Sequence, residues 1–448
     1  MFKFQVSVQN QYIILRKYKF LISIKKRCTA CFIYTTSANS GEPTKMERTA
    51  VITNHRLSLG LLWLVMATSS IVFIEPTPYD VLGAGLMLVF FALGLRFPPG
   101  LGTAAYLLGI FALANIVASA VAPDPVASFR SLSVRLYMLV TWIFFTCLIY
   151  ENPKPVLRIL FSGYTVAAIL AVTLGILGYY RLVPYTDQLL EFGRVRALFK
   201  DPNVYGPFLV PVAIYVVAGL ESAKRVEAVF LIGIFAYLTF GLLLGFSRGS
   251  WLNFGISLVI YFGLRMLTQT SVRMKRRLLL QAGVVAVFSV LFVGWAISTD
   301  KIQSMIEIRA KLQNYDVQEQ GGRFSRQSII INSALETPLG IGTGQSNLQH
   351  NFGGEPHNIF LQVLIEAGWI GALSFYAFLA LTLSRAFRFV FQPSTVQAVY
   401  IASFACVIGL LAQSFFIDST HWRHLYLLLA MLWGPLLAWQ TDVRSQTA

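Results

Sequence analysis

A histidine and several arginines beside long apolar segments are the residues of this chain whose types suit chemistry. His357 follows Pro356 and opens the apolar stretch HNIFLQVLIEAGW. This spacing predicts a helix whose first turn is HNIF, and a helix N-terminus lowers the pKa of a histidine so that its imidazole is neutral at neutral pH. A neutral imidazole can accept a proton and act as a general base. The alternative is a structural histidine that only bonds Asn358 or lipid headgroups.

Four arginines lie in polar stretches between apolar segments: Arg194 and Arg196 in GRVRALFKDPN, Arg248 in FSRGSW, and Arg323 in GGRFSRQS. Arginine presents a planar, permanently charged fork that suits phosphate or carboxylate. The alternative for each is an interfacial residue whose charged head reaches water. Arg248 fits this alternative less well, because it lies on a very short turn between two apolar segments with no acidic residue nearby. A charge kept at such a junction is a candidate site.

A carboxylate also lies inside the apolar segment that His357 opens. Glu366 is nine residues further along, which places it about 13 Å deeper on a helix and on the opposite face. We therefore expect Glu366 to bond a neighbouring helix or a buried arginine rather than His357. The chain has no cluster of carboxylates, and Cys28 and Cys31 form a lone CTAC, so the sequence predicts neither a metal site nor a cofactor.

The composition is that of a membrane protein. Of the 448 residues, 56% are hydrophobic and 12% are charged, whereas soluble domains have about 25% charged residues. Apolar runs of roughly 17–25 residues, each long enough to cross a bilayer, recur along the chain. The sequence therefore predicts an all-α polytopic membrane protein with about 12 transmembrane helices. The expected spans are 57–75, 79–95, 101–121, 132–150, 155–178, 204–221, 226–245, 250–267, 278–298, 357–382, 397–416 and 422–440.

The distribution of charge orients these spans. With a cytoplasmic N-terminus, the inner segments carry most of the 36 Lys and Arg, which is the positive-inside pattern. The net charge of +16 is then explained by topology and by contact with anionic lipids, and no nucleic-acid partner is predicted. Both termini are expected inside, and residues 1–50 are expected to be a basic cytosolic tail or to precede a true start near Met46.

The same orientation places three polar stretches outside. They are the connection before span 6, the SRGS turn and residues 299–356 between spans 9 and 10. A long loop in a compact protein is usually functional or disordered. This large outer loop contains the amphipathic stretches IQSMIEIRAKLQNY and RFSRQSIIINSAL, which predict short helices at the membrane surface.

Four patterns on this outer side together resemble the O-antigen ligase and O-antigen polymerase family of bacterial envelope glycan transferases. RVRALFKDPN, from Arg194 to Asn203, resembles the first family signature, with Ala197 where glycine is usual. SRG around Arg248 resembles the second. Arg323 followed by PLGIGTG resembles the third. The fourth pattern is matched by His357, Asn358, Leu361, Glu366, Gly368 and Gly371.

The resemblance implies a metal-independent glycosyltransferase of the bacterial inner membrane with a periplasmic active site. The donor would be a glycan on undecaprenyl diphosphate, and the acceptor lipid A–core for a ligase or another lipid-linked glycan for a polymerase. By this resemblance, His357 takes the acceptor proton. The diphosphate-binding candidates are Arg194, Arg196, Arg248 and Arg323. The supporting residues are Asn203, Asn358 and Glu366.

The resemblance also divides the chain. It implies N-terminal transmembrane helices over 51–185, an O-antigen ligase-like catalytic region over 186–382 that includes loop 299–356, and C-terminal transmembrane helices over 383–448. Two other classes fit a chain of this kind, a bicarbonate transporter-like protein and a structural scaffold. The sequence shows no internal repeat of the transporter type, and a scaffold would not require arginines at three helix junctions.

Overall fold

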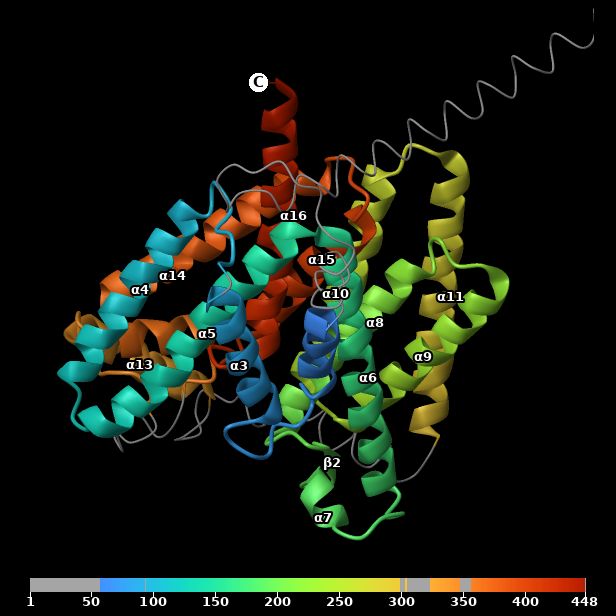
Figure 1. Cartoon of the computed structure of the whole chain (residues 1–448). Coiled ribbons are helices and arrows are strands. Elements are labelled where there is room, and N and C mark those ends of the chain that lie inside the picture. Colours follow the sequence, from blue (N-terminus) through green and yellow to red (C-terminus); the bar gives the residue numbers. More distant parts are fainter. Residues whose placement is uncertain (1–56, 93, 299–302, 304–322, 347–355, 448) are drawn as a thin grey trace, which may run out of the picture. The chain divides into compact units, whose positions relative to one another are not determined.

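The computed structural model describes residues 57–92, 94–298, 303, 323–346 and 356–447, and most of them are helical (Figure 1). The helices are Leu57–Ala67, α3 (Pro78–Ala92), α4 (Gly102–Ala120), α5 (Pro125–Glu151), α6 (Pro153–Tyr179), α7 (Thr186–Leu189), α8 (Pro202–Gly219), α9 (Arg225–Leu244), α10 (Arg248–Thr268), α11 (Val272–Ile297), α13 (Arg323–Glu336), α14 (Ile359–Val390), α15 (Gln397–Gln413) and α16 (Arg423–Thr447). The two-residue strands β1 (Leu190–Glu191) and β2 (Arg194–Val195) pair antiparallel, with Leu190 opposite Val195.

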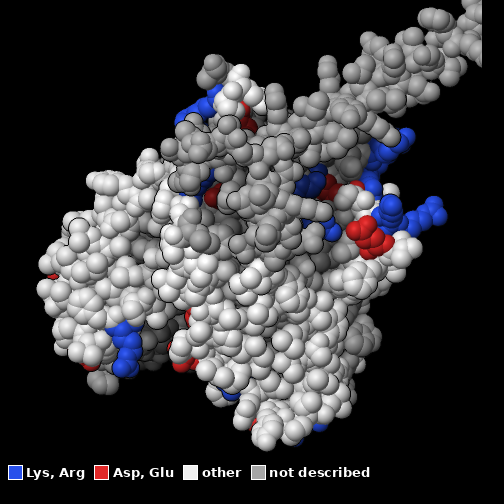
Figure 2. All heavy atoms as spheres, in the orientation of Figure 1, with Lys and Arg blue, Asp and Glu red and all other residues white. Residues whose placement is uncertain are grey.

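The predicted all-helical membrane fold is confirmed in its class. A helix lies at each of the twelve expected spans. Within the described residues, seven helices are long and apolar enough to cross a bilayer, namely α4, α5, α6, α8, α9, α10 and α14. Figure 2 shows a broad uncharged surface on one face, with Lys, Arg, Asp and Glu mostly toward the top and bottom of the view. A surface of this kind suits contact with lipid.

The first expected span, 57–75, is wrong in its extent. Its helix ends at Ala67, and the chain continues without helix to α3. The β-branched pair Ile71 and Val72 has low helix propensity, and Pro76 disfavours helical backbone at the residue before it. Val72 instead donates its backbone N–H to the carbonyl oxygen of Leu198 at 3.0 Å. This connection is therefore part of the surface next to the first signature.

Small residues let the helices approach closely. The most extensive helix contacts are α10 with α15, α4 with α14, and α5 with α16. A glycine lies at each crossing. A Cβ on Gly409 would meet Ser257 at 2.3 Å, one on Gly371 would meet Ala114 at 3.1 Å, and one on Gly434 would meet Ile149 at 2.6 Å. Backbones in membrane bundles often pack through small residues in this way.

The described unit has two distinct ends. The C-terminal end of α16 and the α7–β2 segment lie at opposite ends of it (Figure 1). The end that carries α7 and β2 is called the outer end below, after the predicted topology. The large loop contributes α13, so the helix predicted for RFSRQSIIINSAL is confirmed. The stretch IQSMIEIRAKLQNY lies outside the described residues, apart from Gln303.

Helix α14 is broken at Gly368, whose φ of 69° and ψ of −173° are not helical. The Gly-rich loop from Pro338 to Gly344 lies against the break. Ile341 donates its N–H to the carbonyl of Ile365 at 2.9 Å, and Trp369 donates to Pro338 at 3.0 Å. Backbone groups freed inside a membrane must find such partners. The PLGIGTG segment therefore packs against the broken helix, and the first part of α14, Ile359–Ala367, is a separate helical piece.

Candidate functional site

Arg194 and the SRG turn are brought together by one side-chain amide. Arg194 lies at the start of β2 and is 7% exposed. It donates from Nε to the carbonyl of Gly245 at 3.0 Å and from Nη2 to Oδ1 of Asn203 at 2.8 Å. Ser247 donates to the same oxygen at 3.0 Å. Asn203 thus connects the first signature to the second, beside Arg248 at the start of α10.

Ala197 explains why glycine is usual at this position of the signature. Its φ is 50°, in the left-handed region, and its side chain is buried. Only glycine adopts this conformation without steric cost. The loop nevertheless keeps this conformation, because Ala197 and Arg196 both donate backbone N–H groups to the carbonyl of Leu189, at 3.0 and 3.1 Å.

Arg196 lies apart from the other candidates. Its side chain is bound to the loop itself, with Nε donating to the carbonyl of Gln188 at 3.1 Å. It lines a separate hollow of about 350 Å³ together with Phe73 and Leu198. Among the described residues, Arg196 and His357 do not line the same cavity. Arg194 is likewise not among the residues that line the cavity with His357.

His357 lies before its helix and not in the first turn, so the predicted HNIF start is wrong. Helix α14 begins at Ile359, and Asn358 is its N-cap, accepting from the backbone N–H groups of Phe360 and Leu361 at 2.9 and 3.2 Å. His357 has a φ of 49°. Asparagine is among the residues that cap a helix N-terminus best. Because Asn358 takes the N-cap position, His357 lies outside the helix.

His357 lines a cavity of about 480 Å³ at the outer end. Three connections that are far apart in the sequence meet there, those before α3, before α8 and before α16. The charged and histidine residues that line it with His357 are Glu75, Lys200, Asp201, Asp418, His421, Arg423 and His424. Asp201 is the N-cap of α8 and accepts from the N–H of Asn203 at 2.7 Å. The first signature and His357 therefore border one hollow.

The connection between α15 and α16 was missed by the sequence analysis. Asp418 and His421 lie 3.7 Å apart, from Oδ2 to Nδ1, and Thr420 donates to Asp418 at 2.7 Å and contacts Nδ1 of His421 at 2.9 Å. Burial alone would raise the pKa of the Asp418 carboxyl, but the bonds from His421 and Thr420 hold that pKa below its usual value. The signal was present as DSTHWRH, which places charged residues and two histidines in a very short outer connection.

Two ion pairs frame the cavity. Arg423 binds Asp80 through Nε at 2.7 Å, and Thr77 donates to the same carboxylate at 2.9 Å. Lys200 binds Glu75 at 2.5 Å, with both side chains more than half exposed. Exposed pairs of this kind contribute little to stability. The Arg423–Asp80 pair is largely sheltered and fixes the start of α16 to the start of α3.

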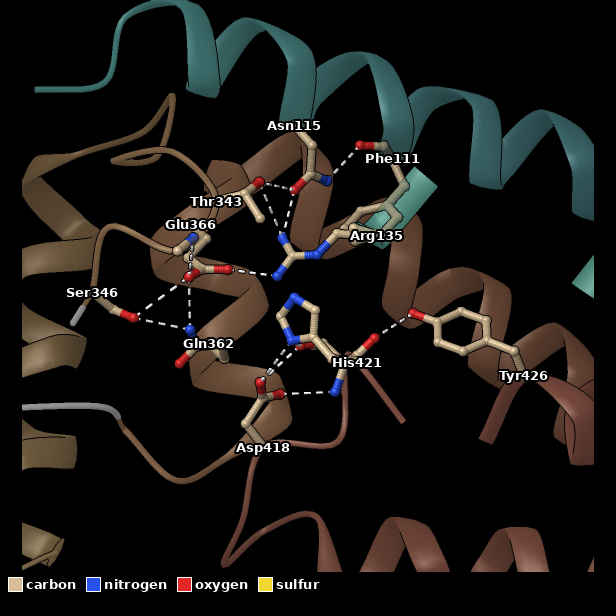
Figure 3. Close-up of polar contacts among 12 residues, drawn as sticks. Phe111, Asn115, Arg135, Thr343, Ser346, Gln362, Glu366, Asp418, His421 and Tyr426 are labelled. Atoms are coloured by element: carbon tan, nitrogen blue, oxygen red, sulfur yellow. Dashed lines mark hydrogen bonds and ion pairs between the residues drawn. The ribbon is translucent and has the colours of Figure 1, made fainter. Parts of the chain in front are cut away.

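The third arginine candidate is only partly described. Arg323 begins α13, and its side chain lies outside the described part of the chain. Glu366 is fully buried and its carboxylate binds Arg135 of α5 at 2.5 Å (Figure 3). The prediction that Glu366 bonds a buried arginine is confirmed. In the described ranges no three His, Cys, Asp or Glu side chains gather as a metal site requires.

A part of the chain is similar to a known family. Residues 233–376 match the family model described as O-antigen ligase. The matched region contains Arg248, Arg323, His357 and Glu366, whereas Arg194 precedes it. No curated protein matches the chain. The matched region thus contains three of the four patterns, and segments outside it complete the cavity around His357.

Proposed function

We propose that this O-antigen ligase domain protein is a glycosyltransferase that works at the periplasmic face of the bacterial inner membrane. It moves a glycan from undecaprenyl diphosphate to a hydroxyl of lipid A–core. The observation that carries the proposal is the cavity at the outer end, which His357 shares with Lys200 and Asp201 of the first signature. The domain family and the large apolar surface support a substrate that is anchored in lipid.

In the proposed reaction, His357 accepts the proton of the acceptor hydroxyl while its oxygen attacks the anomeric carbon of the donor. The new carbon–oxygen bond forms as the bond from the anomeric carbon to the diphosphate oxygen breaks. Undecaprenyl diphosphate leaves with the bonding electrons. Arg194, Arg248 and Arg323, with Arg196 as second choice, stabilise the negative charge that develops on the leaving group, as a cation does elsewhere. No metal or cofactor takes part.

The contacts of Arg194 support its place in this scheme. Its Nε and Nη2 atoms bind Gly245 and Asn203, so the protein fixes the orientation of the guanidinium. A charged group that is fixed in advance can stabilise the charge that develops on a leaving group without reorganising. Three residues then support the site: Asn203 holds Arg194, Asn358 caps α14, and Glu366 anchors the part of α14 before Gly368.

Transfer to another lipid-linked glycan, as in an O-antigen polymerase, uses the same chemistry on a different acceptor. The alternative from another functional class is a bicarbonate transporter-like protein. Broken helices such as α14 occur in transporters, where the freed backbone groups line a substrate site. Here the break at Gly368 is filled by the loop from Pro338 to Gly344. This observation favours the transferase.

The experiment is gel analysis of envelope glycans from a deletion strain complemented with wild type, His357→Ala, or Arg276→Ala as an exposed control on the inner side. For a ligase, the deletion and His357→Ala leave bare lipid A–core, and long glycan accumulates on the carrier lipid. For a polymerase, they leave core with a single repeat unit. Arg276→Ala should behave as wild type. Normal glycans in every strain would overturn the transferase proposal, and bicarbonate uptake would then be assayed.

A further inference from the structure

A buried charged network lies on the helix that follows His357 and on its neighbours, and the sequence gives no direct sign of its centre, Arg135. Arg135 of α5 is 1% exposed and binds Glu366 of α14 through Nη2. Its Nη1 donates to Oδ1 of Asn115 on α4 at 2.6 Å and contacts Thr343 of the Gly-rich loop at 3.5 Å (Figure 3). One guanidinium thus joins two helices and a loop to α14.

The second oxygen of Glu366 extends the network. It accepts from the backbone N–H of Gly344 and from Nε2 of Gln362, both at 2.7 Å, and from Ser346 at 3.4 Å. Gln362 lies one turn before Glu366 and also donates to Ser346 at 2.9 Å. The carboxylate therefore connects the loop to the first part of α14, Ile359–Ala367. We call Arg135, Asn115, Thr343, Gln362 and Glu366 the Arg135 network.

Stability alone is a weak reason to keep such a network. Removing two charges from water has a large cost, and apolar residues of similar volume often stabilise a fold as well or better. Ionisable residues inside a membrane usually serve function. The chain has a second buried pair, Glu221 with Arg265, in which Nε of Arg265 binds Glu221 at 2.7 Å. That pair lies at the inner end, away from His357, and provides a matched comparison.

The network acts on the segment that carries His357. Because α14 is broken at Gly368, the piece Ile359–Ala367 is not held in line by the rest of the helix. Glu366 and Gln362 fix this piece to the Gly-rich loop and to α5. At its other end, the N–H of Ile359 donates to the carbonyl of Ser414 at 2.9 Å. The piece therefore spans the distance between the Arg135 network and the connection that carries Asp418 and His421.

Figure 3 shows the connection before α16 together with the Arg135 network. In this view the imidazole of His421 points from Asp418 toward Arg135. His421 lines the cavity with His357, whereas Arg135 does not. The Arg135 network is therefore linked to the cavity through the piece of α14 that follows His357.

We propose that Arg135 is a positioning residue for the transfer reaction: through Glu366 it sets the place of His357 in the cavity. The inference rests on the proposed function. General-base catalysis is sensitive to small displacements, and a shift of about 1 Å can lower a rate by about 10²-fold. Arg135 is not among the residues that line the cavity, so it acts on His357 through Glu366.

The test compares two double variants. Arg135→Met with Glu366→Met removes both charges of the network without leaving one of them buried alone. Arg265→Met with Glu221→Met does the same at the inner end. Each protein is measured for thermal unfolding and for glycan transfer per folded molecule. Membranes of the deletion strain, which accumulate the lipid-linked glycan, are titrated as the donor source.

We expect the network variant to lose tenfold or more in maximal rate, with an unchanged half-saturating amount of donor and little change in Tm. The inner-end variant should keep its rate. Thr343→Val is a milder second variant, which removes one contact of Arg135 and should lower the rate by a smaller factor. It keeps the test decisive if the double variant does not fold.

The possible results separate the two proposals. If wild type transfers glycan, His357→Ala does not, and the folded network variants keep full rate, the role of Arg135 is overturned while the transferase stands. If His357→Ala transfers glycan as well as wild type, the proposed function itself fails. If the network and inner-end variants lose rate equally and in step with their Tm, the network is only structural.

Discussion

Arg194 and Ser247 share one acceptor, the side-chain oxygen of Asn203, at 2.8 and 3.0 Å. This oxygen lies at the start of α8 and holds two loops that are separated by more than forty residues of chain. The two signatures of which these residues are part are therefore a single structural unit. Asn203 fixes the segment that carries Arg194 and the segment that carries Arg248 in position relative to each other.

Replacing Asn203 should disturb both segments at once. Asn203→Leu keeps the size of the side chain but removes the acceptor, so Arg194 and Ser247 lose a partner, at a cost of about 1–3 kcal/mol. Asn203→Asp keeps the acceptor and should retain most of the stability. Thermal unfolding and glycan transfer are measured on both. Equal behaviour of the two variants would show that the shared oxygen has no such role.

Arg248→Lys distinguishes an enzyme from a scaffold. Lysine keeps the charge but not the planar fork that binds two phosphate oxygens at once. We therefore expect transfer to fall by tenfold or more while the protein level and Tm stay unchanged. Arg276→Lys, an exposed arginine at the start of α11, is the matched control. A scaffold would tolerate both substitutions in the envelope glycan assay.

Asp418→Asn should affect both transfer and the dependence of stability on pH. The pKa of Asp418 is lower in the folded protein than its ordinary value of 3.8, so folding favours the ionised carboxylate. Its contribution to stability is fully present above the unfolded pKa and is lost as pH falls through the folded pKa. The Tm difference between wild type and Asp418→Asn should thus be largest above about pH 5 and shrink in more acidic solution.

The control for the pH experiment is Asp442→Asn, at the exposed end of α16. It should change Tm little at any pH. A Tm difference for Asp418→Asn that stays constant from acidic to neutral pH would contradict the role assigned to the ionised carboxylate. Transfer is measured in parallel at neutral pH, where we expect loss of activity because His421 loses its charged neighbour in the cavity.

Gly368→Ala tests the break in α14. A Cβ there would meet the carbonyl oxygen of Pro338 at 2.3 Å and the backbone nitrogen of Gly340 at 2.7 Å. Backbone atoms cannot move aside cheaply, and a left-handed alanine adds strain of about 1–3 kcal/mol. We expect a lower Tm and less transfer. Gly233→Ala in α9, where a Cβ meets nothing within 4 Å, should stabilise by about 0.5–1 kcal/mol. Equal Tm changes would argue against a fixed break.

Much of the fold could be predicted from the sequence. The length and apolar character of each run predict the helices, because a bilayer requires hydrophobic segments of fixed length whose backbone bonds are satisfied internally. The amphipathic period of RFSRQSIIINSAL predicts α13 in the same way. The extent of the first helix was wrong, since Val72 finds a partner in Leu198, which lies far along the chain.

Local sequence by itself also determined the candidates for chemistry, because residue type decides what a side chain can bind. His357, Arg194, Arg248 and Glu366 were all identifiable in this way, and so was the need of Glu366 for a partner. The partner itself was not identifiable. Arg135 lies 231 residues from Glu366, and helical segments of this kind can pack in many orders.

Only the tertiary structure decided which of these residues meet. It left Arg194, Arg196 and Arg248 out of the lining of the cavity that contains His357. It placed His357 before its helix, because Asn358 is the N-cap, and it added Asp418 and His421 from a short connection. The physical reason is that sites at the end of a bundle are assembled from loops that are remote in sequence. Their geometry depends on helix packing and on individual backbone angles, such as the positive φ of His357, which no local pattern specifies.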